Sequence, residues 1–241
     1  MISMETQDIY EIWDKESDGV LTVEPLILTV CREGKAGSVF AYPGGCIYKT
    51  FFTYLCGIPD EDLLSEHPDL LYENRLACMS PEWAEYVRRQ PVRFILRREL
   101  MEPYCQEPVK KPGALPDGYT LSPFTRGIFE AHPFDHGRGY RDHQDFTDRG
   151  AGAAVLYDGQ VVSAASSFLT YEGHVELDVF TEPEHRGRGL AGHCVFEMLR
   201  QCSAKKYTVH WDAQNRMSSR MAKSHGFVPL TDYAVYWIDK P

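Results

Sequence analysis

A glycine-rich segment between an expected strand and an expected helix is the part of the sequence best suited to bind an anion. It reads Thr181-Glu-Pro-Glu-His-Arg-Gly-Arg-Gly-Leu-Ala191. Its glycines allow successive backbone N–H groups to turn toward one point at the positive end of the helix. Arg186 and Arg188 add positive charge, so a phosphate or a pyrophosphate is the preferred guest. The glycines alone leave open a solvated turn with two surface arginines.

Two carboxylates stand on the strand just before this segment. Residues 174–180 read HVELDVF and alternate with period two. Glu176 and Asp178 therefore share one face of the strand, and the apolar residues between them share the other. Two carboxylates on one face raise each other's pKa, which suits the removal of a proton from an attacking amine, directly or through water. The alternative is that both face solvent or pair with an arginine.

The same glycines also satisfy the dinucleotide-binding fingerprint. Gly187, Gly189 and Gly192 have the G-x-G-x-x-G spacing, and Asp212 follows about 20 residues later. In that fingerprint, however, the first glycine follows its strand almost at once, whereas residues 181–186 intervene here. The chain after Asp212 is also too short for the rest of a doubly wound sheet. These two features argue against an NAD site.

The residues from Arg186 onward resemble the signature of the GNAT acyltransferases. Arg186-x-x-Gly189-x-Ala191 is similar to the Q/R-x-x-G-x-G/A pyrophosphate loop of that family, and Asn215, Ser218 and Gly226-Phe227 are similar to its N-x-x-A/S … G-F segment. The resemblance covers about residues 119–237. It implies acetyl-CoA as co-substrate and direct transfer of an acetyl group to a primary amine of a small molecule or a peptide. The whole chain further resembles a bacterial GNAT subgroup with an additional N-terminal domain.

The resemblance implies a set of cofactor-binding residues. On the strand, Val179, Phe180 and Thr181 would diverge from the neighbouring strand and pair with the pantetheine arm of CoA, one N–H holding the thioester oxygen. Asn215 and Ser218 would lie beside that arm. The diphosphate would be bound by the loop residues Arg186, Gly187, Arg188, Gly189, Leu190 and Ala191. Glu176 and Asp178 would then be the catalytic carboxylates.

The sequence departs from the family at one catalytic position. Many GNAT enzymes carry a tyrosine seven residues after the asparagine, which protonates the departing thiolate, but Ala222 stands there. The thiolate could leave unaided, or another hydroxyl could replace the tyrosine. The candidate hydroxyls are Ser218, Ser219, Tyr233 and Tyr236. This departure keeps open a non-catalytic CoA-binding or interaction module.

The expected fold class is α+β with a mixed sheet, in three parts. Residues 1–101 form a small α+β domain, residues 102–118 a proline-rich linker, and residues 119–241 the GNAT domain. Strands are expected at 23–30, 38–42, 92–96, 152–156, 161–168, 174–180, 207–211 and 233–238, and helices at 60–74, from 80 onward, at 190–203 and at 218–224.

Bulk properties limit the partners. A net charge of −10 argues against nucleic acid, whose binding depends on clustered Lys and Arg. Seven scattered cysteines suggest neither disulfides nor zinc, and the sequence has neither a signal peptide nor a membrane span, so we expect a soluble, cytoplasmic protein. The oligomeric state stays open.

Three further groups have weaker functional interpretations. His132, His136 and His143, with Asp135 and Asp142, could hold a metal but fit better a loop that borders the substrate cleft, and no metal is expected. Residues 44–50 lack the glycine that a phosphate loop needs before its lysine. Trp211 and Asp212 either line the acceptor pocket or are a buried tryptophan with a capping aspartate.

Overall fold

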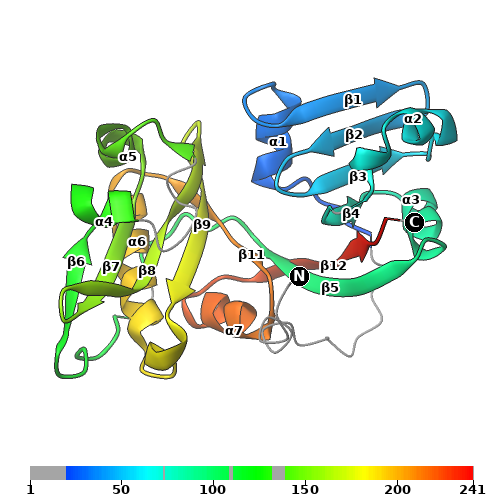
Figure 1. Cartoon of the computed structure of the whole chain (residues 1–241). Coiled ribbons are helices and arrows are strands. Elements are labelled where there is room, and N and C mark those ends of the chain that lie inside the picture. The colour runs from blue at the N-terminus through cyan, green and yellow to red at the C-terminus, as the bar shows by residue number, and fades with distance from the viewer. Residues whose placement is uncertain (1–19, 73, 109–110, 132–138, 241) are drawn as a thin grey trace. The chain divides into compact units, whose positions relative to one another are not determined.

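The computed structural model describes residues 20–72, 74–108, 111–131 and 139–240, which pack into two compact units (Figure 1). The first takes the described residues within Met1–Met101, Asp212–Arg220 and Pro229–Pro241, and the second takes those within Glu102–Trp211 and Met221–Val228. Neither unit is continuous in sequence, because the last strand groups with the N-terminal part of the chain. The division into 1–101, 102–118 and 119–241 remains a prediction about domains, and it differs from these units at the C-terminal end.

A seven-stranded mixed sheet forms the first unit, in the order β1-β2-β3-β4-β12-β5-β11. Its strands are β1 (Ser38–Tyr42), β2 (Gly45–Lys49), β3 (Thr53–Gly57), β4 (Leu76–Cys78), β5 (Val92–Met101), β11 (Asp212–Ala213) and β12 (Pro229–Ile238). Only β3 and β4 pair in parallel. The C-terminal strand β12 runs antiparallel to β5 along most of its length, and Figure 1 shows the two side by side. The segment 44–50 is therefore a turn and strand rather than a phosphate loop.

One expected strand of this unit is wrong. Residues 23–30 were expected to be extended, but the chain forms helix α1 (Leu26–Arg32) after Pro25. The apolar residues Leu26, Ile27, Val30 and Cys31 are all buried, and their spacing fits one face of a helix. The β-branched residues of this run favour a strand only weakly, and the packing of the apolar helix face overrides that preference.

The other helices of this unit follow their capping residues. Asp60 accepts the N–H of Leu63 and starts α2 (Glu61–Glu66), and Pro68 then begins a separate 3₁₀ helix (Pro68–Leu70), so the single helix expected over 60–74 is interrupted. Ser80 accepts the N–H of Trp83 and starts α3 (Pro81–Arg88), as the sequence predicted. Trp83 lies fully buried in the core beneath the sheet.

A five-stranded sheet forms the second unit, in the order β10-β9-β8-β7-β6. Its elements are β6 (Tyr119–Pro123), α4 (Arg126–Ala131), α5 (His143–Arg149), β7 (Gly152–Tyr157), β8 (Gln160–Tyr171), β9 (His174–Thr181), a 3₁₀ helix (Pro183–His185), α6 (Leu190–Ala204), β10 (Thr208–His210) and α7 (Arg216–Ser224), whose last residues belong here. The mixed α+β fold class is confirmed. The helices α4 and α5 and the strand β6 were not predicted.

Helices cover both faces of this sheet, α4 on one and α6 on the other (Figure 1). Ala164 of β8 packs with Ile128 and Phe129 of α4, whereas Ser163 points to Cys194 of α6. Because β9 pairs in register with β8, its odd-numbered residues face α6 and its even-numbered residues lie on the opposite face of the sheet. The carboxylates of Glu176 and Asp178 therefore share one face, as the alternation predicted.

A continuous line of apolar residues along one face of α6 explains why this helix forms. Its apolar positions recur at three and four residues and are all buried in the structure, namely Leu190, Cys194, Val195, Met198, Leu199 and Cys202. This amphipathic pattern accounts for the helix expected at 190–203. In the part of the chain that the structure describes, α6 and every other helix is too short or too polar to cross a membrane.

A buried ion pair anchors Asp212, which follows β10 in the chain, to the sheet of the first unit. Arg98 of β5 donates from Nε to both carboxylate oxygens of Asp212 at 3.0 Å, and its Nη2 donates to the Asp212 carbonyl. The phenol of Tyr233 on β12 donates to the same carboxylate at 2.6 Å. Only 13% of the Arg98 side chain and 10% of the Asp212 side chain are exposed. Asp212 thus has a structural role, as the partner of a buried arginine and not as the capping residue that the sequence suggested.

Removing Asp212 should destabilise the protein strongly. Asp212→Ala leaves a buried guanidinium without a counter-charge, and breaking a buried pair from one side costs about 3–5 kcal/mol. Urea unfolding measures this loss, with Asp232→Ala as the control because Asp232 is exposed on β12. The double variant Arg98→Met/Asp212→Leu should recover part of the stability. A loss for Asp212→Ala no larger than for Asp232→Ala would contradict the role of the pair.

Candidate functional site

The centre of the candidate site is the point where β10 stops pairing with β9. The two strands pair in parallel only from His174 to Glu176 of β9, against Thr208 to His210 of β10. Strand β9 continues to Thr181, whereas the chain after β10 enters β11 and pairs with β5. The last five residues of β9 thus extend beyond the register of β10. The divergence that the family resemblance implied is present at this edge.

The backbone of β9 presents alternate N–H groups to this edge. The N–H of Glu182 donates to Val162 on β8, so N–H groups of odd-numbered residues point the other way, to the side of β10. Val179 is one of these residues. Its N–H donates to the carboxylate Oδ1 of Asp178 at 2.9 Å. Asp178 therefore lies against one of the strand amides, Val179 to Thr181, among which the resemblance places the donor to the thioester oxygen.

An irregularity in β8 lies directly opposite Glu176. The register shifts between Ser167 and Leu169, so that Ser167 pairs with Leu177 and Leu169 pairs with Glu176. Tyr140, which precedes α5, bonds through its hydroxyl to Ser167 and Thr170 on either side of the shift. A bulge turns the neighbouring side chains and increases the local twist. The position of Glu176 thus depends on a bulge that the α5 region holds in place.

The α5 region is itself fixed by a charged network. Arg149 donates to the carboxylate of Asp145 from both Nε and NH2, and its guanidinium lies 4.4 Å from the ring centre of Tyr140. The hydrogen bond from Arg149, followed by that from the backbone N–H of Arg141, holds the pKa of Asp145 below its usual range. Asp145 therefore stays ionised at neutral pH, which keeps Tyr140 against the bulge.

Two histidines stand beside Glu176 on the same face. His210 of β10 is the register partner of Glu176, and its Nε2 lies 2.8 Å from Nδ1 of His174, two residues before Glu176 on β9. Burial and the neighbouring charge of His174 lower the pKa of His210 to about 4. His210 is therefore neutral at physiological pH. The sequence interpretation did not include either histidine.

The glycine loop has the geometry of an anion site. Gly187 and Gly189 adopt positive φ angles of 75° and 76°, and a Cβ at either position would meet no atom within 4 Å. Gly189 is the N-cap of the 15-residue helix α6, whose first turn has no acidic residue. Within the described residues, the backbone N–H groups from Gly187 to Ala191 donate to no other main-chain group. These amides are available to a ligand at the positive end of the helix.

Neighbouring residues hold the loop at the end of β9. Nε of Arg186 donates to the carbonyl of Thr181 at 3.1 Å, and Nδ1 of His185 lies 2.9 Å from the hydroxyl of Tyr119 on β6. Leu190 and Ala191 have buried side chains, so only their backbone can reach a ligand. Arg186 and Arg188 are exposed, as a phosphate contact requires. The loop therefore forms one continuous surface with the end of β9.

Asn215 and Ser218, which the sequence assigned to the cofactor, belong to the first unit. The Oδ1 of Asn215 accepts the N–H of Ser218 at 2.9 Å and caps the start of α7. Ser219 donates to the buried carboxylate of Glu99. Burial, together with the charge of Asp212, raises the pKa of Tyr233 well above its usual value, which makes this phenol a poor proton donor. Ala222 is fully buried.

Other residues singled out in the sequence have structural roles. Trp211 is 3% exposed and packs edge-on against Phe227, which also stacks on Tyr104. Asp142 caps α5, and Nε2 of His143 lies 2.9 Å from the carbonyl of Phe124. The rest of the histidine cluster, His132, Asp135 and His136, lies outside the described residues. No group of three possible metal ligands occurs among the described residues.

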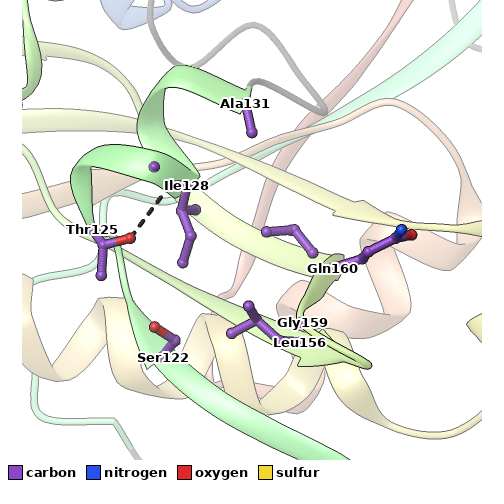
Figure 2. A pocket seen from close by; sticks show the side chains of 9 residues that line it. Ser122, Thr125, Ile128, Ala131, Leu156, Gly159 and Gln160 are labelled. Carbon is purple, nitrogen blue, oxygen red and sulfur yellow. Dashed lines mark hydrogen bonds between the residues drawn. The ribbon is translucent and has the colours of Figure 1, made fainter.

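A separate cavity of about 630 Å³ lies between α4 and the β7–β8 hairpin (Figure 2). Figure 2 shows Ile128, Leu156 and Gln160 around it, and Thr125 accepting the N–H of Ile128 at the start of α4. None of the residues that the sequence assigned to catalysis or to the cofactor lines this cavity. It is distinct from the edge of β9 and from the glycine loop.

Comparison with known proteins identifies the family. The model of the GNAT acetyltransferase family matches residues 26–236, which include parts of both compact units. The chain belongs to the GNAT acetyltransferase family. An uncharacterized N-acetyltransferase of Bacillus subtilis, YdfB, is 28% identical over 140 residues, which are 56% of this chain and 54% of that protein. The chain thus spans about half the length of this curated relative.

Solved structures show the same GNAT fold. A GCN5-related N-acetyltransferase-like protein from Streptococcus suis has a TM-score of 0.70 at 24% identity, with 88% of this chain and 92% of that chain covered. A GCN5-related N-acetyltransferase from Kribbella flavida has a TM-score of 0.57 at 14% identity, with 87% and 94% covered. At these identities the likeness concerns the fold. The expectation of a GNAT-type acyltransferase is confirmed at the level of the family.

The expected site residues of this GNAT protein are divided between the two compact units. Glu176, Asp178 and the strand and loop residues from Val179 to Ala191 form one continuous part of the second unit. Asn215 and Ser218 belong to the other unit. His174 and His210 were missed, although each lies on an expected strand of the site. Their pairing depends on the register of β9 with β10, which the sequence does not reveal.

The environment of His210 predicts an acid-sensitive contribution to stability. The folded protein binds a proton at His210 only near pH 4, whereas an unfolded histidine does so near pH 6.5. The unfolded state therefore binds more protons between these values, and stability should fall as the pH drops from about 6.5 toward 4. NMR titration of the imidazoles and urea unfolding of wild type and His210→Gln across this range measure both effects. An ordinary pKa near 6.5 for His210 would contradict this environment.

Proposed function

We propose that this protein is an N-acetyltransferase that moves an acetyl group from acetyl-CoA to a primary amine of a small molecule or a peptide. The observation that carries the proposal is the continuous surface from the edge of β9 to the N-terminus of α6. It combines an edge that β10 covers only as far as Glu176 with a loop of five available amides. These are the two features that an extended thiol arm ending in a diphosphate needs.

In this proposal the loop binds the diphosphate of CoA. The amides of Gly187, Arg188, Gly189, Leu190 and Ala191 would donate to its oxygens, and the side chains of Arg186 and Arg188 would add charge. The open space beside Gly187 and Gly189 supports this role, because a phosphate must approach the backbone closely there. A group with two negative charges gains from the positive end of α6 as well.

The strand residues Val179, Phe180 and Thr181 would bind the pantetheine arm along the edge of β9. The amide of Val179 would hold the thioester oxygen, where negative charge develops during attack. The carboxylate of Asp178 now accepts this N–H and would have to turn away when the thioester binds. Asp178 would then control access to the amide, in addition to the catalytic role that the sequence suggested.

Glu176 is the proposed general base. It lies on the face of β9 opposite α6, at the last residue paired with β10. An ammonium group must lose a proton before its nitrogen can attack, and a carboxylate takes that proton directly or through water. The nitrogen then attacks the thioester carbon, the C–S bond breaks, and the thiolate takes the second proton of the amine.

Asn215 and Ser218 stay proposed ligands of the pantetheine arm, and the general acid stays unassigned. An N-terminal domain additional to the GNAT domain and a cytoplasmic location are likewise proposals.

The buried Ala222, where the family places a tyrosine, favours one alternative, a CoA-binding module without catalysis. Thiol release from acetyl-CoA with a panel of polyamines, aminoglycosides and peptides tests the two. Turnover with an amine supports the enzyme, and CoA binding without turnover supports the module.

The loop predicts a charge-specific loss of affinity at Gly189. Gly189→Asp places a carboxylate beside the diphosphate, and the repulsion should weaken CoA binding by a factor of about 100 or more. Gly189→Asn is the matched control, because asparagine has the same shape and also tolerates a positive φ angle. Isothermal calorimetry with CoA measures both variants. Equal affinities for the two would show that the diphosphate does not bind at this loop.

Glu176→Gln should lower kcat by about 100-fold and change its pH dependence, because the amide cannot accept the proton of the acceptor. Affinity for CoA should stay close to that of wild type, since the edge and the loop keep their amides. Glu172→Gln serves as the control, as Glu172 is exposed in the turn before β9. An unaltered pH profile of kcat in Glu176→Gln would exclude Glu176 as the base.

A further inference from the structure

The hydrogen bond between His174 and His210 has no role in the function described above. Both rings lie on the face of the sheet that carries Glu176, and both are half-buried. The register sets His210 beside Glu176, and Nε2 of His210 lies 2.8 Å from Nδ1 of His174. The three side chains therefore form a row from the end of the β9–β10 pairing back to the start of β9.

The outer end of this row is close to solvent. His174 is the first residue of β9 and follows the tight turn of Glu172 and Gly173, in which Glu172 is exposed. His210 is the inner member, next to the point where β10 leaves β9. A proton that reached His210 could thus pass through one hydrogen bond to a ring at the exposed turn.

We propose that His210 and His174 act as a proton-transfer pair that carries to solvent the proton that Glu176 takes from the acceptor ammonium. This inference rests on the proposed acetyl transfer and adds to it a fate for the proton. Glu176 cannot serve a second turnover until it has lost that proton. The pair would restore its carboxylate for the next turnover.

The step balances in protons and charge. An N–H bond of the ammonium breaks and an O–H bond forms on Glu176, which leaves the nitrogen lone pair free to attack. The proton then moves from Glu176 to His210, and His210 gives a proton from Nε2 to Nδ1 of His174. His174 releases one proton to water, so both rings return to the neutral form. No oxidant or reductant takes part.

The environment of His210 makes its protonated form short-lived. Among the described residues, His174 contacts His210 directly, and Glu176 and Asp178 lie on the same face of the neighbouring strand β9. Burial, followed by the charge of His174, lowers the pKa of His210 to about 4. His210 is therefore neutral when a proton arrives, and it does not retain the proton it receives.

Two variants separate proton transfer from simple packing. His210→Gln keeps a donor near the position of Nε2, and His174→Asn keeps a polar group near the position of Nδ1, but neither side chain carries a proton onward. Each variant reports on the pair from a different end, so a folding defect in one leaves the other informative. His67→Gln is the control, because His67 is exposed in the first unit.

The experiment is the pH profile of kcat from pH 6 to 10, at saturating acetyl-CoA, with the amine that the acceptor panel identifies. In both variants kcat should fall by about tenfold or more at pH 7 and recover as the pH approaches 10, because hydroxide then accepts the proton. The KM for acetyl-CoA and the profile of His67→Gln should match wild type.

A structural role of the pair predicts a different result. If the histidines only hold β10 against β9, the variants lose the same factor of kcat at every pH, and that result overturns the proposal while wild-type turnover upholds the acetyltransferase. Wild type that turns over no amine, although it binds CoA, overturns the proposed function and the proton-transfer pair together. The two failures are therefore distinguishable.

Discussion

The end of the pairing between β9 and β10 is the constraint on which the candidate site depends. Parallel strands share hydrogen bonds along their length, so a strand that leaves early exposes an edge of its neighbour to another partner. Here β10 pairs only as far as Glu176, and β9 continues to Thr181. The register of this short pairing places His210 beside Glu176. The N–H of Val179, which lies beyond the pairing, points to the exposed edge of β9. The edge proposed to bind the pantetheine arm and the histidine pair proposed to transfer the proton thus both depend on where β10 stops pairing with β9.

The departure of β10 is stabilised by the residues that follow it. Trp211 packs on Phe227 within the second unit, and Asp212 pairs with the buried Arg98 in the first. A buried ion pair contributes little net stability but is costly to break, so it specifies one arrangement of the chain. The chain that follows β10 forms β11, which pairs with β5 within the first unit.

On the other side of the site, a bulge and a helix terminus determine where the chemistry would occur. The irregularity in β8 opposite Glu176 is held by Tyr140, which Arg149 and Asp145 support in turn. The loop after β9 ends at the N-terminus of α6, where amides and dipole favour negative charge. The chain belongs to the GNAT acetyltransferase family, and these local features show how its own residues would supply the binding and the proton transfer that the proposed reaction needs.

The sequence by itself determined the features that depend on near neighbours. The stripe of α6, the alternation that sets Glu176 and Asp178 on one face, the capping of α3 by Ser80 and the glycine loop all follow from spacing and backbone freedom. Local preference failed at α1, where packing turned a β-branched run into a helix. Only the tertiary structure decided that β12 pairs with β5, that Asp212 neutralises Arg98, and that His210 meets His174 beside Glu176. Such pairings join residues far apart in the chain, and strand register, which no single segment encodes, determines which of them meet.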